Sequence, residues 1–316
     1  MSGADLGSVE GIVELTEVRG HAAAEAERQR GLAFEGLPPL DLVIEVPHGA
    51  TATVDFTSLA AQLTSPLPEG LVDFFHVNTD AGAPELALAA AVALVAAEPD
   101  RRVAIARCRV PRTFIDCNRR IDATAEELRA GKVTPGLMPW ITTAEDRQLL
   151  RAAYDRYVAT VAGLTARLRP DGAMLLLHTY APRTVDVQVD LQIVESLRRA
   201  YRPEIEPTWP LRPEVDVIGR DPDGVDHSPP AVVAALRAEL AALGLTLADG
   251  ATYPLHSSTL AWSHVMAHPG RALCVEVRRD LVADPFDPFV QMKMSEDKID
   301  RLGRALAAAM RAWWKT

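Results

Sequence analysis

The sequence predicts an α/β fold, a three-layer sandwich in which helices flank a central mixed, mostly parallel sheet. Short runs that are apolar almost throughout alternate along the chain with longer amphipathic runs, as strands interleaved with helices do. Several short runs lack polar alternation, which is typical of strands covered on both faces. The chain has 316 residues and a hydrophobic content of 48%, enough for one large core. We therefore expect a single domain over residues 1–316, with its core at about 40–314 and an N-terminal extension at 1–39.

The expected elements follow from these runs. Strands are predicted at residues 42–46, 103–108, 173–177, 215–218 and 272–277. Helices are predicted at residues 84–97, 144–168, 230–243 and 296–314. Pro84 and Pro230 suit a first helical turn, and Gly244 follows the end of the third helix. The Pro-rich stretch 201–213 and the Gly-, Pro- and Asp-rich stretch 219–230 lack periodicity and are expected to be surface loops.

The charge balance and the N-terminal residues restrict the function classes. The chain has 33 Lys and Arg against 43 Asp and Glu, a net charge of −10, which opposes binding to nucleic acid or to anionic membranes. The first twenty residues lack the positive and apolar regions of an export signal, so we expect a cytoplasmic protein. The apolar stretch 86–97 is shorter than the roughly 20 residues that span a bilayer and is expected to be a buried helix.

The three cysteines do not form a recognisable motif. Cys108, Cys117 and Cys274 are odd in number and lack CxxC spacing, so neither a disulfide framework nor a thiolate zinc site is indicated. We expect three buried thiols in the core.

Two histidines directly follow predicted strands. His48 lies in Val-Pro-His-Gly-Ala after the strand at 42–46, and His178 follows the apolar strand at 173–177. Open α/β sheets bind ligands at the carboxyl ends of their strands, so both imidazoles could meet there and bind zinc. The alternative is that both are ordinary loop or packing residues.

Charged residues in two further segments could take part in chemistry. Glu276 interrupts an apolar strand, either as the partner of Arg278 or Arg279 or as a base in a site. Residues 111–122 are rich in charge, and a guanidinium beside an amide can bind a carboxylate at two points. A solvated loop with internal ion pairs is the alternative for this segment.

Taken in order, these motifs resemble the N-formylglutamate amidohydrolase family, whose fold is related to metallocarboxypeptidases and aspartoacylases. The resemblance covers roughly residues 40–310 and implies the zinc carboxypeptidase-like, or phosphorylase/hydrolase-like, form of the fold. The matching motifs are Val46-Pro-His-Gly49, Thr79-Asp-Ala-Gly82, Arg112 with Asp116-Cys-Asn-Arg119, His178-Thr179, Tyr253-Pro254 and Val275-Glu-Val-Arg278.

The resemblance implies a zinc-dependent amidohydrolase that uses a metal-activated water. It assigns His48, Asp80 and His178 as metal ligands and Glu276 as the base. It assigns Arg112 as the oxyanion donor. Asn118 and Arg119 would bind the substrate carboxylate, with Asp116 orienting Arg119. The implied cofactor is Zn²⁺, and the implied substrate is a small N-acyl amino acid or short peptide with a free carboxylate.

The third ligand is the least determined of these assignments. Thr51 stands where the carboxypeptidase relatives have a Glu, so the resemblance points to Asp80. Asp80 could instead cap the helix that begins near Pro84, in which case Glu85 or His76 are the remaining candidates.

Three positions depart from the family pattern. Leu176 replaces an Asp that often orients the second histidine, Glu45 replaces a small residue, and Tyr253-Pro-Leu-His-Ser-Ser258 lacks the usual glycines. These differences leave open a carboxypeptidase-like or aspartoacylase-like hydrolase of another substrate. They also leave open a metal-free binding protein on the same fold.

Overall fold

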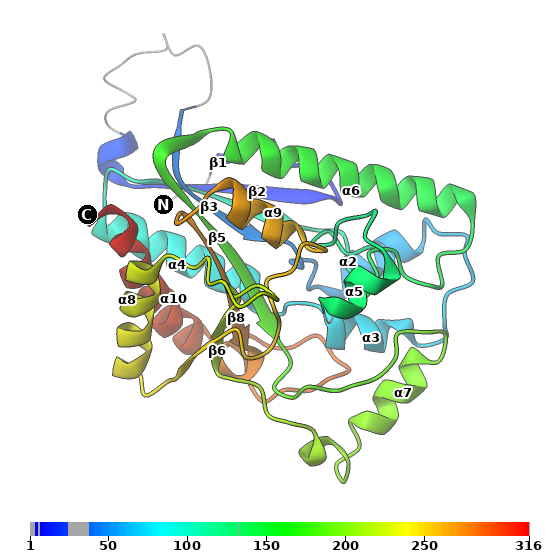
Figure 1. The fold of residues 1–316 in the computed structure, drawn as a ribbon. Helices are drawn as coiled ribbons and strands as arrows, with labels where there is room; N and C mark the ends of the chain where they lie inside the picture. Colours follow the sequence, from blue (N-terminus) through cyan, green and yellow to red (C-terminus); the bar gives the residue numbers. More distant parts are fainter. Residues whose placement is uncertain (1–3, 6, 25–37, 132, 316) are drawn as a thin grey trace.

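The computed structural model describes residues 4–5, 7–24, 38–131 and 133–315. Its described residues form one mixed sheet of eight strands in the order β1-β2-β4-β3-β5-β8-β6-β7 (Figure 1). The strands are β1 Ala4–Asp5, β2 Val13–Arg19, β3 Leu40–Val46, β4 Arg102–Cys108, β5 Leu168–Tyr180, β6 Val215–Val217, β7 Leu247–Asp249 and β8 Ala272–Arg278. The central strands β4, β3, β5 and β8 are parallel, whereas β2 and β6 join them antiparallel. The predicted mixed α/β fold is confirmed, and each expected strand lies in the sheet.

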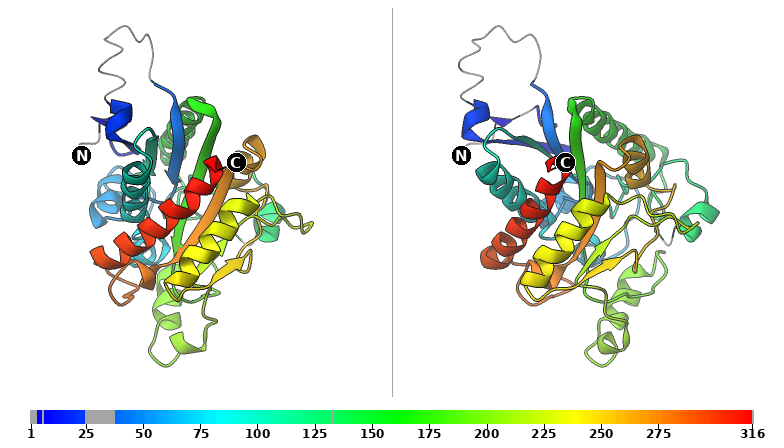
Figure 2. Two further views of the ribbon diagram at one scale, coloured as in Figure 1. Left: turned by 90° about the vertical axis from the view of Figure 1, so that its left-hand side faces the viewer. Right: turned by 60° about the vertical axis from the view of Figure 1, so that its left-hand side comes forward.

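Helices cover both faces of the sheet. They are α2 Thr53–Ala60, α3 Leu71–Asn78, α4 Ala83–Ala97, α5 Ala125–Ala130, α6 Ala144–Thr165, α7 Ile193–Ala200, α8 Pro230–Ala242, α9 Leu260–Ala267 and α10 Glu296–Met310. Helices α4, α8 and α10 pack together on one face (Figure 2). Helix α6 crosses the other face, where α2, α3, α7 and α9 also contribute to the core. Successive side chains of each strand point to these two layers in turn, because the side-chain period of a strand is two.

One predicted helix end was wrong, and a second predicted helix changes type before its end. The helix expected at 144–168 ends at Thr165, because the chain turns there and Leu168 already begins β5. The helix expected at 296–314 is α-helical to Met310 and continues as a 3₁₀ turn over Arg311–Trp314. In both cases, apolar residues continue across the boundary, so the sequence pattern did not show it.

The expected N-terminal extension contains a strand of the main sheet. Val13–Arg19 pairs with β4 over all seven residues, and its alternating pattern in VELTEVR is the period-two signal of a half-buried strand. The extension therefore does not lie wholly outside the core. Residues 25–37, in the same predicted extension, lie outside the described residues.

The most apolar stretch of the described chain forms core helices. Leu71–Ala97 is long and apolar enough by composition to cross a membrane. It is divided into α3 and α4 by residues 79–82, and the greater part of it is buried within the protein. Its apolar character is therefore explained by packing against the sheet.

Candidate metal and substrate site

The two histidines lie at the carboxyl ends of neighbouring parallel strands. His48 follows β3, and His178 is the third residue from the end of β5. Gly49 is required beside His48, because a Cβ atom there would lie 2.6 Å from the Arg107 Cγ. The Thr179 hydroxyl donates to the Ala81 carbonyl oxygen at 2.8 Å, which ties the end of β5 to the loop that carries Asp80.

His48, Asp80 and His178 form one buried cluster. The Asp80 Oδ2 lies 3.3 Å from the His48 Nδ1 and 2.9 Å from the His178 Nδ1. The three ligand atoms lie within 4.8 Å of one another. Four-coordinate zinc holds nitrogen and oxygen ligands at about 2.0–2.2 Å, which puts neighbouring ligands roughly 3.3 Å apart. The donor types and spacing therefore fit a single cation with one position left open.

Asp80 does not cap α4. The N-cap of α4 is Gly82, which has a φ of 88°, and a Cβ atom at Gly82 would lie 2.5 Å from the Val282 Cγ2. The Asp80 side chain instead faces the histidines, and its loop is held by Arg279, which donates to the Val77 carbonyl oxygen at 2.8 Å and also to that of Thr79. The capping alternative is therefore not supported.

The two reserve ligands lie outside this cluster. Glu85 is exposed on α4. His76 is buried, but its Nε2 lies 3.4 Å from the Thr53 hydroxyl and not beside the other two histidines.

Asp116 contacts more of the site than the sequence indicated. Its Oδ2 lies 3.3 Å from Arg119 Nη2, as expected for a residue that orients this arginine. The same oxygen lies 3.1 Å from Arg112 Nη2, and the other, Oδ1, lies 2.8 Å from His48 Nε2. A carboxylate bonded to Nε2 of a histidine fixes the ring and presents Nδ1 to a metal, and the His48 Nδ1 also lies 3.3 Å from the Arg112 Nη1.

The cluster favours ionised groups despite its burial. Burial opposes the charge of Asp80, but the charge of His48 and hydrogen bonds with both histidines hold its pKa below the usual range. Burial likewise opposes the charged form of His178, but bonds with Asp80 and Cys274 hold the pKa of its imidazole well above normal. The Asp80 and His178 pair thus holds a proton at a position where a metal cation could replace it.

Glu276 lies on β8 directly beside His178 on β5. Its Oε2 is buried, and no hydrogen-bond partner for it exists among the described residues. Burial raises the pKa of Glu276, and the charge of Asp80 raises it further against the opposing effect of His178. Arg278 instead pairs with Asp280 at 2.7 Å, and Arg279 donates to backbone carbonyl oxygens. The arrangement leaves the Glu276 carboxylate available to a ligand.

The residues expected to bind a carboxylate are fixed by backbone contacts. Asn118 Oδ1 accepts from the Ala261 N–H at 3.0 Å, so its amide nitrogen is not used in this contact. Arg119 Nε donates to the Thr134 carbonyl oxygen at 3.1 Å. These contacts restrict the rotamers of both side chains and so orient their remaining donors.

One cavity of about 1050 Å³ joins these groups. Seven of the eight expected site residues line it, and Asp116 lies behind them. Nine buried side-chain polar atoms in the described chain lack a hydrogen-bond partner, and six belong to lining residues. They are in Asn78, Arg112, Thr134, Thr252, Glu276 and Arg279. Unsatisfied polar atoms are costly when buried, so their concentration here indicates a ligand site.

The family model described as N-formylglutamate amidohydrolase matches residues 40–283. The chain belongs to the N-formylglutamate amidohydrolase family. A crystal structure of an N-formylglutamate amidohydrolase from Ralstonia eutropha JMP134 is 18% identical, with a TM-score of 0.54 over 95% of this chain and 97% of that one. The structure of an Agrobacterium tumefaciens gene product is 16% identical, with a TM-score of 0.50 over 97% and 95%. At these identities the likeness shows the fold. No curated protein sequence matches the chain significantly.

The three departures from the family pattern have different structural consequences. Leu176 is buried in the core on the His178 side of β5 and cannot orient the histidine, whose imidazole instead interacts with Asp80 and Cys274. Glu45 accepts a hydrogen bond from the Tyr157 hydroxyl at 2.8 Å. It therefore belongs to the packing beneath the site.

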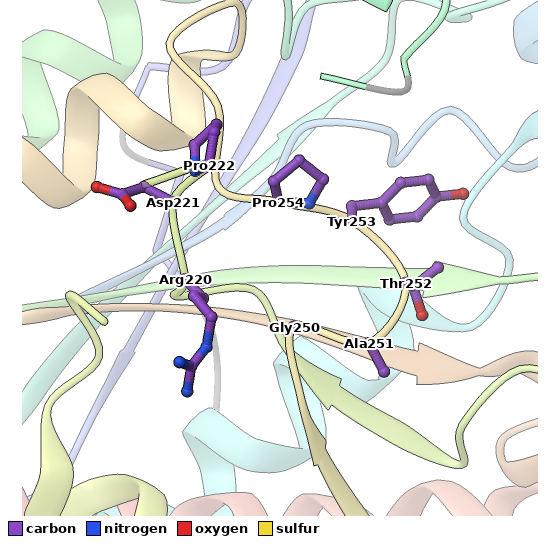
Figure 3. A pocket seen from close by; sticks show the side chains of 8 residues that line it. All are labelled: Arg220, Asp221, Pro222, Gly250, Ala251, Thr252, Tyr253 and Pro254. Carbon is purple, nitrogen blue, oxygen red and sulfur yellow. The ribbon is translucent and has the colours of Figure 1, made fainter. Parts of the chain in front are cut away.

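The altered turn contributes Tyr253 to the wall of the cavity. A smaller cavity of about 260 Å³ is lined by residues 250–254 of the chain together with Arg220, Asp221 and Pro222, whose side chains are drawn in Figure 3. Tyr253 points away from Arg220, which lines that smaller cavity.

Several lining residues were missed by sequence reasoning. Arg183, Arg212 and Arg279 all reach the large cavity. Arg212 belongs to the stretch 201–213, which is irregular as predicted, but with its neighbours Pro210, Leu211 and Pro213 it also lines the cavity. No periodicity marked them, because their position depends on contacts with distant segments. Arg279 follows Glu276 closely in sequence, and that proximity was the available signal.

Proposed function

We propose that this chain is a zinc-dependent amidohydrolase that cleaves the amide of an N-acyl amino acid such as N-formylglutamate. Membership of the family supports a hydrolase that acts on amide bonds. The observation that carries the metal assignment is the buried His48, Asp80 and His178 cluster, open to a cavity beside the unpartnered Glu276 carboxylate. Two imidazoles, one carboxylate and an open position are the donor set of catalytic zinc sites.

Each remaining residue has a role in this proposal. A bound Zn²⁺ supplies Lewis acidity and lowers the pKa of water. Glu276 would accept the proton of the attacking water and then donate it to the leaving amine. Arg112, whose Nε is unsatisfied among the described residues, would stabilise the developing oxyanion.

Asn118 and Arg119 would bind the substrate carboxylate in this proposal. Both line the cavity near Arg112, and both are oriented by contacts that leave donors free. The expected cytoplasmic location stays a prediction.

The alternatives differ in substrate or in metal. A carboxypeptidase-like or aspartoacylase-like hydrolase would use the same cluster on a peptide or on another N-acyl amino acid. A metal-free binding protein on the same fold is less favoured, because three ionisable groups around one point are costly to bury without a counterion. Hydrolysis of a panel of N-formyl, N-acetyl and peptide substrates distinguishes the two hydrolase alternatives.

The metal assignment is tested by elemental analysis. We expect about one zinc per chain in the purified protein, because one open site is formed. The double substitution His48→Ala and His178→Ala should abolish it. Stoichiometric zinc that survives this substitution would refute the assignment, and circular dichroism of the variant checks that it folds.

A further inference from the structure

An arginine from an irregular segment is fixed beside the proposed metal cluster. The Arg212 N–H donates to the Pro182 carbonyl oxygen at 2.8 Å, and the Thr184 N–H donates to that of Pro210 at 2.9 Å. These bonds pair the segment before β6 with the residues that follow β5. Because β5 also carries His178, the backbone of Arg212 has a defined position relative to the cluster.

The Arg212 guanidinium has only neutral partners. It lies over the Tyr180 ring at 5.0 Å and the Tyr253 ring at 5.7 Å from their centroids. It donates to the Tyr253 hydroxyl at 3.0 Å and to the Thr184 hydroxyl at 3.2 Å, and its Nη1 lies 3.4 Å from the Ala181 carbonyl oxygen. Within the described part of the chain, no carboxylate lies within salt-bridge distance. The aromatic rings thus hold a cation in place without neutralising it.

Two other arginines near the cluster are paired with a carboxylate, whereas Arg183 and Arg279, which also line the cavity, donate to backbone carbonyl oxygens. Arg112 and Arg119 both lie within 3.3 Å of Asp116, so their charges are balanced in part inside the protein. Arg212 lines the same cavity without such a partner. The proposed base, Glu276, lines this cavity as well. The cavity therefore contains a cationic group in addition to those of residues 112–119.

We propose that Arg212 binds a second anionic group of the substrate, the side-chain carboxylate of an N-acyl dicarboxylic amino acid. This inference rests on the proposed function and names the residue that would select the side chain of its substrate. A planar guanidinium recognises a carboxylate through two parallel hydrogen bonds. A neutral side chain would leave Arg212 without these charge-assisted bonds, so the site discriminates against it.

The test compares two substrates that differ only in this group. We measure kcat/KM of the zinc-loaded enzyme for N-formyl-L-glutamate and N-formyl-L-glutamine. The parent enzyme should prefer the glutamate compound. Arg212→Gln should lower kcat/KM for that compound roughly 10- to 100-fold, the range for losing a hydrogen bond to a charged group. The same substitution should change kcat/KM for the glutamine compound little. Arg212→Lys keeps the charge and should retain part of the preference.

Arg220→Gln is the matched control. It removes the same charge from a residue that lines the smaller cavity (Figure 3) and not the large one. The Arg220 side chain is exposed, so we expect kcat/KM for either substrate to change by less than about twofold. An equal loss in this control would show that the effect of Arg212 reflects overall charge and would overturn the inference.

A binding measurement separates this inference from the proposed function. Calorimetry with L-glutamate and L-glutamine on the zinc-loaded protein reports recognition without turnover. If neither formyl compound is hydrolysed, the proposed function fails, but a preference for L-glutamate that Arg212→Gln removes still supports the role of Arg212. Equal losses on both substrates, or no preference in turnover and binding, would show that Arg212 only stabilises the fold.

Discussion

Asp116 is the residue on which most of the site contacts converge. Its two oxygens contact His48, Arg112 and Arg119, and Oδ1 also accepts from the Asn118 N–H at 2.8 Å. The positive charges around it hold the pKa of Asp116 well below the usual range, although burial opposes this. A single carboxylate thus orients a proposed metal ligand and both arginines of the 112–119 region.

Asp116→Asn should therefore weaken zinc binding while the protein still folds. The amide has one acceptor oxygen and no charge, so it cannot serve the histidine and the arginines together. We expect a loss of zinc affinity of about 10- to 100-fold, the usual effect of removing a residue that orients a metal ligand. Competition with a chelating dye measures it. Asp146→Asn, the same change at a buried aspartate away from the cavity, is the control, and equal affinities in all three proteins would contradict the prediction.

Glu276→Gln should separate metal binding from turnover. The amide keeps the shape of the side chain but cannot accept the proton of water, and removal of a general base typically costs 10²–10⁴-fold in rate. We expect unchanged zinc content and a fall in kcat of about that size. Glu45→Gln changes a buried glutamate that lies outside the cavity and should keep most of the activity. Near-normal turnover in Glu276→Gln would make Glu276 a structural residue.

At the scale of elements, the first turn of α6 is attached to the loop at residues 64–65 through Asp146. Its carboxylate accepts from the Thr64 N–H at 3.0 Å and from the Ser65 N–H at 2.6 Å. Burial opposes the charge, but these bonds hold the pKa of Asp146 below its usual value. The helix N-terminus also favours a negative charge at this position.

The contribution of Asp146 to stability should depend on pH. The pKa is lower in the folded than in the unfolded state, so the stabilisation is full above the unfolded value, near 4, and is lost as the pH falls below it. Melting temperatures of the parent and Asp146→Asn should therefore differ most at pH 5–7 and converge towards pH 2. Asp155→Asn, at an exposed pair with Arg151 on the same helix, should change the melting temperature little at any pH. A constant difference for Asp146→Asn would contradict this.

At the scale of the whole molecule, the proposed metal joins segments that are distant in the sequence. Its ligands come from the end of β3, from the loop before α4 and from β5. A ligand that binds the folded state alone stabilises it, by about 2.7 kcal/mol at a concentration of 100 times its Kd. Removal of zinc with a chelator should therefore lower the melting temperature by an amount on the order of 5 °C. The variant with His48→Ala and His178→Ala should show no shift, and an identical shift in that variant would exclude this cluster as the cause.

The sequence by itself predicted the fold class, the central strands and the residues that meet at their carboxyl ends. Uninterrupted apolar runs mark buried parallel strands, and such strands align their ends, so His48 and His178 could be placed together. The sequence did not show that Val13–Arg19 extends the sheet, although its alternation is visible, and it did not predict the short helices α2, α3, α5, α7 and α9. Helices of two turns contain too few residues to show a period.

The tertiary structure alone decided which partners each charged residue has. The contacts of Asp116 with His48, of Arg279 with the loop before α4, and of Arg212 with Tyr180 and Tyr253 join segments that are far apart in the chain. Such contacts depend on the path of loops, whose conformation is set by hydrogen bonds and packing with neighbours and leaves no periodic pattern in the sequence. The sequence therefore determined where the site lies in the sheet, and the folded chain determined which arginines face a substrate.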